Sequence, residues 1–400
     1  MRRSALLTVC LAVFVDMLGF GIILPLLPFH TQDLGGTGIW VGALLTSYAA
    51  AQFVAAPVLG SLSDRFGRRP VLIAALLGSA ISLALTGVAG TLATLLLARV
   101  VAGAFGGAIA IGQAYVSDFT VGKARTQALG MIGASIGMGF VFGPAIGALL
   151  ADLGFAGVSF VAAGVALANA ILGYFLLPRT TPAAAGAPAR RGGGNPLTAL
   201  RHALGNAALR PLLLVIFAFT FAFVGMEATF ALLGAERFGL DARALGLVFA
   251  GIGIMMAIVQ GGLVGRLSGS FGNRKVAIAG ALLLAAGLVI LPFVSPWVGY
   301  PALGLLAVGQ GLLTTTTSAL IAEEGGAELG GAFGVSQSAS ALARALGPLA
   351  AGALYDVKIP LPYLLGAALA LLAAALLVSR RRGGTAPATP AETGQPATAS

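Results

Sequence analysis

The sequence is poor in charged residues. Only 9% of its 400 residues are Asp, Glu, Lys or Arg, whereas a soluble domain has about 25%. Hydrophobic residues make up 58% of the chain, and the mean hydropathy is +0.98. So apolar a chain would not stay monomeric in water. We therefore expect a membrane protein whose surface is partly covered by lipid.

Cysteine and histidine are also scarce, which excludes two kinds of site. The single Cys10 cannot form an intramolecular disulfide. His30 and His202 are far apart in sequence, so we expect no metal cluster. The sequence also has no Walker-type nucleotide loop and no nucleophile–base set. We therefore expect no cofactor, no metal and no enzymatic activity.

Long apolar runs occur twelve times, each of about the 20 residues that a bilayer-spanning helix needs. They lack the alternation of barrel strands, so an all-α membrane protein is predicted. Glycine, 59 of 400 residues, lets such helices pack closely. The predicted spans are 5–29, 39–60, 70–90, 91–116, 126–150, 154–177, 210–234, 243–267, 275–295, 297–321, 329–355 and 359–379.

Basic residues gather on one side of these spans. If the N-terminus is cytoplasmic, 18 of the 23 Lys and Arg residues lie in cytoplasmic loops and tails. This asymmetry follows the positive-inside rule and predicts both termini in the cytoplasm, for a protein of the inner (plasma) membrane. The net charge of +10 is then spread along one membrane face. It forms no compact patch, so we do not expect a nucleic-acid partner.

Two pairs of segments recur at nearly the same separation. Residues 60–70 (GSLSDRFGRRP) match residues 265–275 (GRLSGSFGNRK) at six of eleven positions, about 205 residues apart. Residues 143–152 match residues 347–356 at almost the same offset. The chain is therefore predicted to be a duplication, with two pseudo-symmetric bundles of six helices that both start on the cytoplasmic side.

The duplication divides the chain into four parts. We predict an N-terminal bundle at 1–177 and a C-terminal bundle at 210–382. Between them lies 178–209, rich in proline, alanine and glycine, which predicts a flexible cytoplasmic linker. Residues 383–400, rich in Ala, Thr, Pro and Gly, predict a disordered cytoplasmic tail.

Three motifs carry a resemblance to a known family. Residues 60–72, GSLSDRFGRRPVL, resemble the loop 2–3 signature of the major facilitator superfamily. Residues 137–147, GMGFVFGPAIG, resemble its helix 5 antiporter motif. Residues 97–103, LARVVAG, partly resemble the helix 4 motif, with Ala102 at the usual glutamine position. The resemblance covers residues 5–380 and implies the twelve-helix major facilitator fold.

Asp16, in the segment FVDMLGFGIILPLLP, is similar to the helix 1 acid of the tetracycline-resistance efflux pumps. Ser82 and Leu283 stand where those pumps carry further acids, and Met256 stands at their helix 8 histidine. The resemblance implies a drug:proton antiporter driven by the proton gradient, and it leaves tetracycline-like and multidrug substrates open. We expect small-molecule substrates, protons and lipid as partners, and a monomer.

Two other interpretations remain open. A major facilitator transporter of a metabolite, such as a sugar or amino-acid derivative, would share the fold and differ in cavity residues. A receptor or scaffold on the same fold would show no flux.

Four ionisable side chains fall deep within the predicted spans: Asp16, Arg99, Glu227 and Arg344. An isolated charge at the bilayer centre costs about 2.5–3.5 kcal/mol on insertion scales, so such residues usually face a cavity or a partner. Asp16 and Arg99 are predicted to meet near the midplane, as a proton-coupling pair or as a fixed ion pair between helices. Glu227 is expected to pair with Arg344, to contact a cationic substrate, or to reach the outer lipid headgroups.

Polar side chains within the spans mark a predicted central cavity. Each of them is either a substrate contact or a hydrogen bond between helices. These residues are Tyr48, Gln52, Gln113, Gln310 and Gln337.

The charged loop is predicted to be a conformational latch on the cytoplasmic side. The resemblance implies that it joins the two halves when the transporter opens outward. Asp64 would face the N-terminus of helix 11, where the helix dipole favours a carboxylate. The alternative is that the arginines only fix the topology. The latch residues are Gly60, Asp64, Arg65, Gly67, Arg68, Arg69 and Asp118, together with Arg344.

A small-residue face runs along the fifth span, and a shorter one lies on the eleventh. Glycines at four-residue spacing lie on one side of a helix and allow close packing. We predict that these faces form seams between the halves, and the resemblance implies that they limit proton leakage. The residues are Gly139, Gly143, Pro144, Gly147, Gly347 and Pro348.

Overall fold

The computed structural model describes residues 3–120, 122–177, 209–324 and 329–379. These residues form helices joined by short connections, and no strand occurs among them. The predicted tail, and the predicted linker up to residue 208, lie outside the described residues.

The first half of the chain forms six crossings, numbered here in chain order, and three of them combine two elements. The elements are α1 (Arg3–Ile23), α2 (Leu27–Asp33), α3 (Gly38–Phe66), α4 (Arg68–Gly87), α5 (Leu92–Phe105), α6 (Ala108–Phe119), α7 (Gly122–Leu149), η1 (Ala151–Leu153) and α8 (Gly154–Leu176). The first crossing combines α1 and α2, the fourth combines α5 and α6, and the sixth combines η1 and α8.

The second half repeats this order. Its elements are α10 (Arg210–Phe238), α11 (Ala242–Ile258), η2 (Val259–Leu263), α12 (Val264–Phe271), α13 (Asn273–Ile290), η3 (Leu291–Phe293), α14 (Pro296–Glu324), α15 (Leu329–Val357) and α16 (Leu361–Ser379). The eighth crossing combines α11, η2 and α12, and the ninth combines α13 and η3.

Eleven of these crossings, within the described residues, are long and apolar enough to span a membrane. Helix α15, the eleventh crossing in chain order, completes the set of twelve. It has 29 residues, as many as α3 and α10, and it packs along both of them. The predicted all-α membrane fold of twelve helices in two bundles is thereby confirmed.

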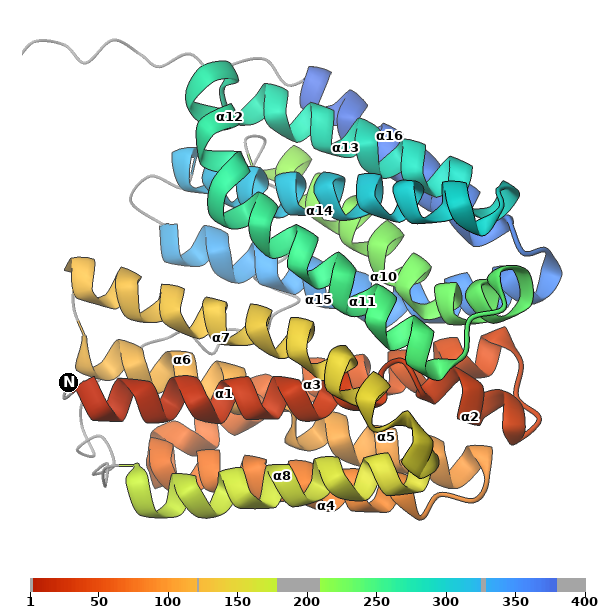
Figure 1. The fold of residues 1–400 in the computed structure, drawn as a ribbon. Helices are drawn as coiled ribbons and strands as arrows, with labels where there is room; N and C mark the ends of the chain where they lie inside the picture. The colour runs from red at the N-terminus through yellow and green to blue at the C-terminus, as the bar shows by residue number, and fades with distance from the viewer. Residues whose placement is uncertain (1–2, 121, 178–208, 325–328, 380–400) are drawn as a thin grey trace, which may run out of the picture.

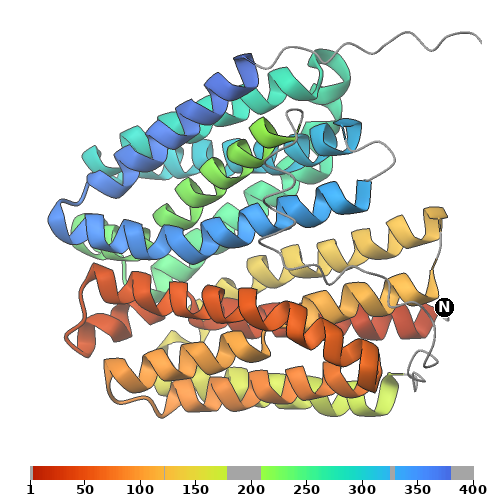
Figure 2. The same cartoon turned by 180° about the vertical axis from the view of Figure 1, so that it is seen from behind.

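The two bundles lie one against the other (Figure 1, Figure 2). Helices α1 to α8 form one bundle and α10 to α16 form the other. The end of the molecule at which α1 begins is named the N-side here, and the other end, at which α3 begins, is named the far side. Most contacts between the bundles are made by α3 with α15 and by α7 with α11.

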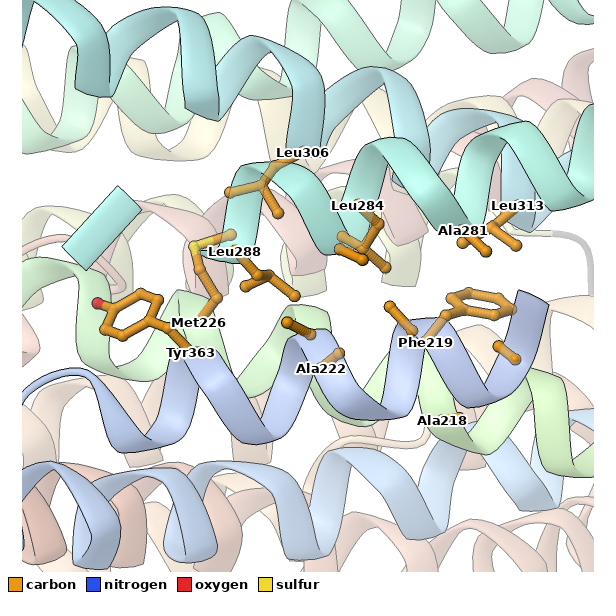
Figure 3. Packing of buried hydrophobic residues seen from close by; sticks show 14 of the residues in the cluster. Ala218, Phe219, Ala222, Met226, Ala281, Leu284, Leu288, Leu306, Leu313 and Tyr363 are labelled. Carbon is orange, nitrogen blue, oxygen red and sulfur yellow. The ribbon is translucent and has the colours of Figure 1, made fainter. Parts of the chain in front are cut away.

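Each bundle has an apolar interior built from complementary side chains. In the second bundle, Phe219, Ala222 and Met226 of α10 face Leu284 and Leu288 of α13 (Figure 3). These residues are 5% exposed or less, so the core is closed to solvent and lipid. Phe219, Ala222 and Met226 are three and four residues apart, so they lie on one side of α10.

Helix α3 meets α15 on the far side. A Cβ added to Gly42 would lie 2.3 Å from the Pro348 carbonyl oxygen, and one added to Gly352 would lie 2.1 Å from the Gly38 carbonyl oxygen. The Leu349 amide also donates to Thr46 Oγ1 at 3.2 Å. Only glycine allows backbones to come this close, so the far side is closed by direct backbone packing.

Helices α7 and α11 close the far side in the same way. A Cβ on Gly246 would lie 2.7 Å from the Pro144 carbonyl oxygen, and one on Gly253 would lie 2.9 Å from Val141. Toward the N-side, a Cβ added to Gly130 or Gly133 of α7 would meet no heavy atom within 4 Å. The same holds for Gly265 and Gly269 of α12. The close backbone contacts between the bundles thus lie on the far side, while these N-side glycines face open space.

The α7 glycines were predicted to pack on the other bundle, and this prediction is wrong. Gly139, Gly143 and Gly147 pack on α1 of their own bundle, where a Cβ on Gly147 would lie 2.3 Å from the Ile22 carbonyl oxygen. Gly347 likewise packs on α10 of its own bundle. A small-residue face predicts that another helix packs closely, but not which helix it is. The seams between bundles are formed instead by the carbonyl groups of Pro144 and Pro348 against glycines of the other bundle.

Candidate transport site

A small polar pocket lies inside the first bundle. Asp16 of α1 lines it together with Ser79 and Ser82 of α4 and with Tyr48 and Arg99 of α3 and α5. Asp16 is 7% exposed and Arg99 is 3% exposed. Two ionisable groups of opposite charge are therefore buried in one pocket, where the surrounding helices shield them from lipid.

The Arg99 guanidinium is only partly satisfied by the protein. Its Nη2 donates to Thr86 Oγ1 at 2.8 Å, while its Nε is buried and has no hydrogen-bond partner among the described residues. No nitrogen–oxygen distance between Arg99 and Asp16 is within 4 Å. The two residues share a pocket as predicted, but this structure does not have the direct ion pair.

The size of this pocket decides what fits beside Asp16. It offers about 20 Å³ to the centre of a water-sized sphere. That volume suits about one water molecule, whereas drug-sized ligands occupy cavities of about 300–1,000 Å³. A water molecule or a proton fits next to Asp16, but a drug does not.

Tyr48 and Gln52 stand one turn apart on α3, at the edge of this pocket. The Tyr48 ring lies against Phe20, with ring centroids 4.9 Å apart. Gln52 Nε2 donates to the Gly106 carbonyl oxygen at 2.8 Å. That carbonyl is freed because the fourth crossing is interrupted between α5 and α6 at Gly106 and Gly107. Gln52 therefore satisfies a break in the backbone rather than facing a ligand.

The second bundle places two further charges near the middle of their helices. Glu227 of α10 is half-buried, and Arg344 of α15 is exposed. The Arg344 guanidinium lies within electrostatic reach of Glu227 and of Tyr48 from the other bundle. No ion pair within 4 Å joins Arg344 to Glu227 or to any other described carboxylate. The predicted Glu227–Arg344 pair is therefore not formed in this structure.

The remaining glutamines have different surroundings. Gln310 of α14 is 7% exposed, and its Oε1 has no partner among the described atoms. Gln337 of α15 and Gln113 of α6 are exposed. A substrate contact at these three positions remains a prediction.

The charged loop forms a network on the N-side. Arg68 pairs with Asp64, and its Nε donates to Asp118 Oδ2 at 2.8 Å. Its Nη1 donates to Ser63 Oγ at 2.6 Å. These partners belong to the first bundle, and in the described part of the chain the loop makes no ion pair with the second bundle. The side chains at the beginning of α15 lie outside the described set, so the predicted contact with Asp64 is not tested.

The other loop residues play backbone roles or lie at the surface. Gly67 has φ 96° and ψ 148°, a conformation open in practice only to glycine. Arg69 donates to the Tyr174 carbonyl oxygen near the end of α8. Arg65 lies 5.3 Å from the centre of the Phe66 ring, and Gly60 has open space at its Cβ position.

A carboxylate on the far side connects the bundles directly. Asp356, at the end of α15, accepts hydrogen bonds from the amide groups of Gly38 and Ile39, at 2.7 and 2.9 Å. It also accepts one from Thr37 Oγ1 at 2.7 Å. An acidic group at a helix N-terminus meets unpaired amides and the positive end of the dipole. Asp356 therefore caps a helix of the other bundle.

The repeat provides a weaker counterpart. Asp152 stands at the position in the first bundle that Asp356 occupies in the second. It pairs at 3.6 Å with Arg243 near the beginning of α11. Each bundle thus extends a carboxylate to the start of a helix in the other bundle.

Comparison with known proteins decides the family. The sequence profile of the Major Facilitator Superfamily matches residues 9–270 and 261–400. The chain belongs to the Major Facilitator Superfamily. Members of this superfamily are transporters of small molecules rather than enzymes in general. The resemblance carried by residues 60–72 and 137–147 is therefore confirmed at the level of the family.

Relatives within the superfamily match nearly the whole chain. The class C tetracycline resistance protein of Escherichia coli is 33% identical over 97% of this chain and 99% of its own length. Multidrug resistance protein 1 of Bacillus subtilis (strain 168) is 29% identical over 90% of this chain and 92% of its own. The crystal structure of the human organic anion transporter MFSD10 (TETRAN) superposes with a TM-score of 0.70. It is 28% identical and covers 94% of this chain and 99% of its own.

Sequence reasoning missed several residues of the site. Ser79 and Thr86 line or complete the Asp16–Arg99 pocket, and with Ser82 they follow a helical spacing of three and four residues. That polar stripe was a readable signal. Asp356 stands at the end of a recognised repeat, but the helix that it caps lies over 300 residues away and could not be read from the pattern.

Proposed function

We propose that this protein is a proton-coupled exporter of small amphipathic drugs that works by alternating access. The observation that carries the proposal is the Asp16 pocket. It holds a buried carboxylate and a partly unsatisfied guanidinium, in a space that suits water but is too small for a drug. Such a site binds and releases protons, while a drug binds elsewhere, between the bundles.

The proposed orientation places the N-side in the cytoplasm, with both termini there, in an inner (plasma) membrane. It rests on the positive-inside distribution of the basic residues. The contacts of Asp356 and of Gly42 then close the outer side, and the bundles are apart toward the cytoplasm. In this state a drug enters from the cytoplasm. Rocking of one bundle against the other then presents it to the outside.

We assign each part of the chain a role in alternating access. Residues 1–177 and 210–382 are the two moving bodies, and 178–209 is the tether between them. The loop at Asp64 and Arg68 is the latch of the outward-open state, because its partners in this inward-open arrangement all belong to one bundle. The exporter is proposed to be a monomer with lipid around it.

Drugs are favoured over metabolites as substrates because relatives across nearly the whole chain are named for tetracycline and multidrug resistance. Between these two, the neutral Ser82 in the Asp16 pocket favours a multidrug range. The resemblance indicates that tetracycline pumps carry an acid at that place. A metabolite such as a sugar or amino-acid derivative is the competing substrate.

The test uses inverted membrane vesicles with an imposed proton gradient, followed by quenching of a pH-sensitive dye. Tetracyclines, fluoroquinolones, phenicols and cationic dyes are added in turn. We expect at least one compound to dissipate the gradient with the wild type and not with Asp16→Asn. Asp33→Asn, which alters an exposed carboxylate at the end of α2, is the matched control and should behave as wild type. If no compound acts on a folded, inserted wild type, drug export is wrong.

A further inference from the structure

A face of α15 begins at the far-side contact with α3 and runs toward the N-side. Pro348 of this face packs on α3, and Leu349 donates to Thr46. One turn further toward the N-side stands Arg344, whose side chain is exposed. The Arg344 guanidinium is within electrostatic reach of Tyr48 of α3, so Arg344 lies toward the other bundle. Arg344 is the first charged residue of α15 on the N-side of the Pro348 contact.

Arg344 forms no ion pair with a described carboxylate. It stands 13 residues from the Val357 end of α15, or about 20 Å at 1.5 Å per residue, which is deep in the bilayer. No described carboxylate lies within 4 Å of its guanidinium, and no described group accepts a hydrogen bond from it. A charge at this depth usually has a partner or serves function. Glu227 and Tyr48 are near enough to act on it electrostatically, but neither is bound to it.

Two further polar side chains share this face. Ser340 lies one turn and Gln337 two turns from Arg344 toward the N-side, where spacings of three, four and seven residues keep side chains together. Ser340 is half-buried and Gln337 is exposed. A guanidinium, a hydroxyl and an amide provide hydrogen-bond donors along about two turns of helix. Arginine in particular can donate two parallel hydrogen bonds to a carboxylate.

We propose that Arg344, with Ser340 and Gln337, binds the acidic group of the transported molecule, so that the substrates are amphipathic compounds bearing a carboxylate, an enolate or a similar anion. This inference rests on the proposed export function and specifies its substrate class. The anionic group of the ligand forms the ion pair that no described carboxylate forms with Arg344. The Asp16 pocket, on the other bundle, is left to the proton.

The test compares acids with their esters, which keep the apolar body and lose the anion. The pairs are rhodamine B with its ethyl ester and norfloxacin with its ethyl ester. Binding to purified protein in nanodiscs is followed by probe fluorescence. We expect the wild type to bind each acid more tightly than its ester, and Arg344→Gln to weaken binding of the acids by at least about tenfold while leaving the esters within about twofold.

Two variants separate charge recognition from general damage. Arg344→Lys keeps the charge and should recover part of the preference for acids. Arg266→Gln removes an exposed arginine of α12 that pairs with no described carboxylate, so it should match the wild type. Thermal unfolding of each variant establishes that it is folded.

The outcomes distinguish this inference from the function beneath it. If the wild type binds acids and esters equally and Arg344→Gln changes neither, drug binding stands and the anion site is wrong. If Arg344→Gln weakens acids and esters alike, Arg344 has a structural role and the anion site is again wrong. If the folded wild type binds no member of either pair, the result contradicts drug export and the anion site together.

Discussion

The two copies of the charged loop share a backbone and differ in charge. At equivalent places Gly67 and Gly272 adopt φ 96° and φ 82°, and each begins a new helix. Two residues after each glycine stands an arginine that donates to carbonyl groups at the end of the bundle's last helix. Arg69 reaches the end of α8, and Arg274 reaches the end of α16. The duplication has preserved the turn and its attachment.

The charged contacts differ between the copies. In the first copy Arg68 pairs with Asp118 at 2.8 Å, while in the second Asn273 donates to Glu323 at 2.6 Å. Asp64 of the first copy corresponds to Gly269 in the second. Both copies thus keep the glycine turn at Gly67 and Gly272, because the fold of each bundle needs it. A carboxylate at this position occurs in only one copy, as Asp64, which fits a latch that needs one charged partner and a neutral counterpart.

The largest expected effect falls on the shared feature. Gly67→Ala and Gly272→Ala should each lower the free energy of unfolding by about 1–3 kcal/mol, because a Cβ is strained at these backbone angles. Unfolding in mixed micelles with denaturant measures this. The matched controls Gly60→Ala and Gly265→Ala replace helical glycines with open space at the Cβ and should not destabilise the fold. A loss confined to one copy would contradict a shared turn.

The second effect falls on the feature present once. Asp64→Asn should slow drug export by at least about tenfold, since a carboxylate at a helix N-terminus contributes up to about 2 kcal/mol to the closed N-side. Stability should be nearly unchanged because the Asp64 side chain is 60% exposed. Transport into inverted vesicles measures the rate. Gly269→Asp, which adds the charge to the second copy, should not replace the function when combined with Asp64→Asn. Restoration by that double variant would show that the two copies are interchangeable.

A smaller loss of stability, similar in both copies, is expected when the arginines that attach the loop to the last helix of each bundle are replaced. Arg69→Gln and Arg274→Gln each remove a cation from the C-terminal end of a helix, where it contributes about 0.3–1 kcal/mol. Both should lower the unfolding midpoint slightly and by similar amounts. A large loss of transport at only one of them would mean that this arginine does more than hold the loop.

The smallest effect should differ in its salt dependence. Asp118→Asn should cost about 0.2–1 kcal/mol, and the cost should shrink in high salt because the Asp118 side chain is 43% exposed. Asn273→Ala removes a hydrogen bond from a neutral donor, so its cost should vary less with salt. The same salt response at both positions would remove the contrast between the copies.

Much of this fold can be read from the sequence, because lipid imposes its requirements locally. Apolar length locates the crossings, and Asp64 with Arg68 signals a loop at one face. Interruptions are harder to read. The break after Phe105 needs Gln52 from another helix to satisfy it, and no pattern within the fourth crossing contains that information.

The sequence predicts which charged residues form the site, but not which partner each of them binds. Rarity of intramembrane charge singles out Asp16, Arg99, Glu227 and Arg344. It does not reveal that Arg99 turns to Thr86, or that Arg344 has no carboxylate within reach of an ion pair. Those outcomes depend on distances between helices. Glycine faces are ambiguous for the same reason, as the packing of Gly143 on α1 demonstrates.

The most direct test of the latch is the distance between the two copies of the loop in the membrane. Phe66 and Phe271 occupy equivalent exposed positions, 55% and 60% exposed, and Cys10, the sole cysteine, can be replaced by serine before spin labels are attached at both. Pulsed electron resonance on the wild type should show a long and a short distance, for the N-side open and closed. Asp64→Asn should deplete the short one. An identical distribution in both proteins would contradict the latch.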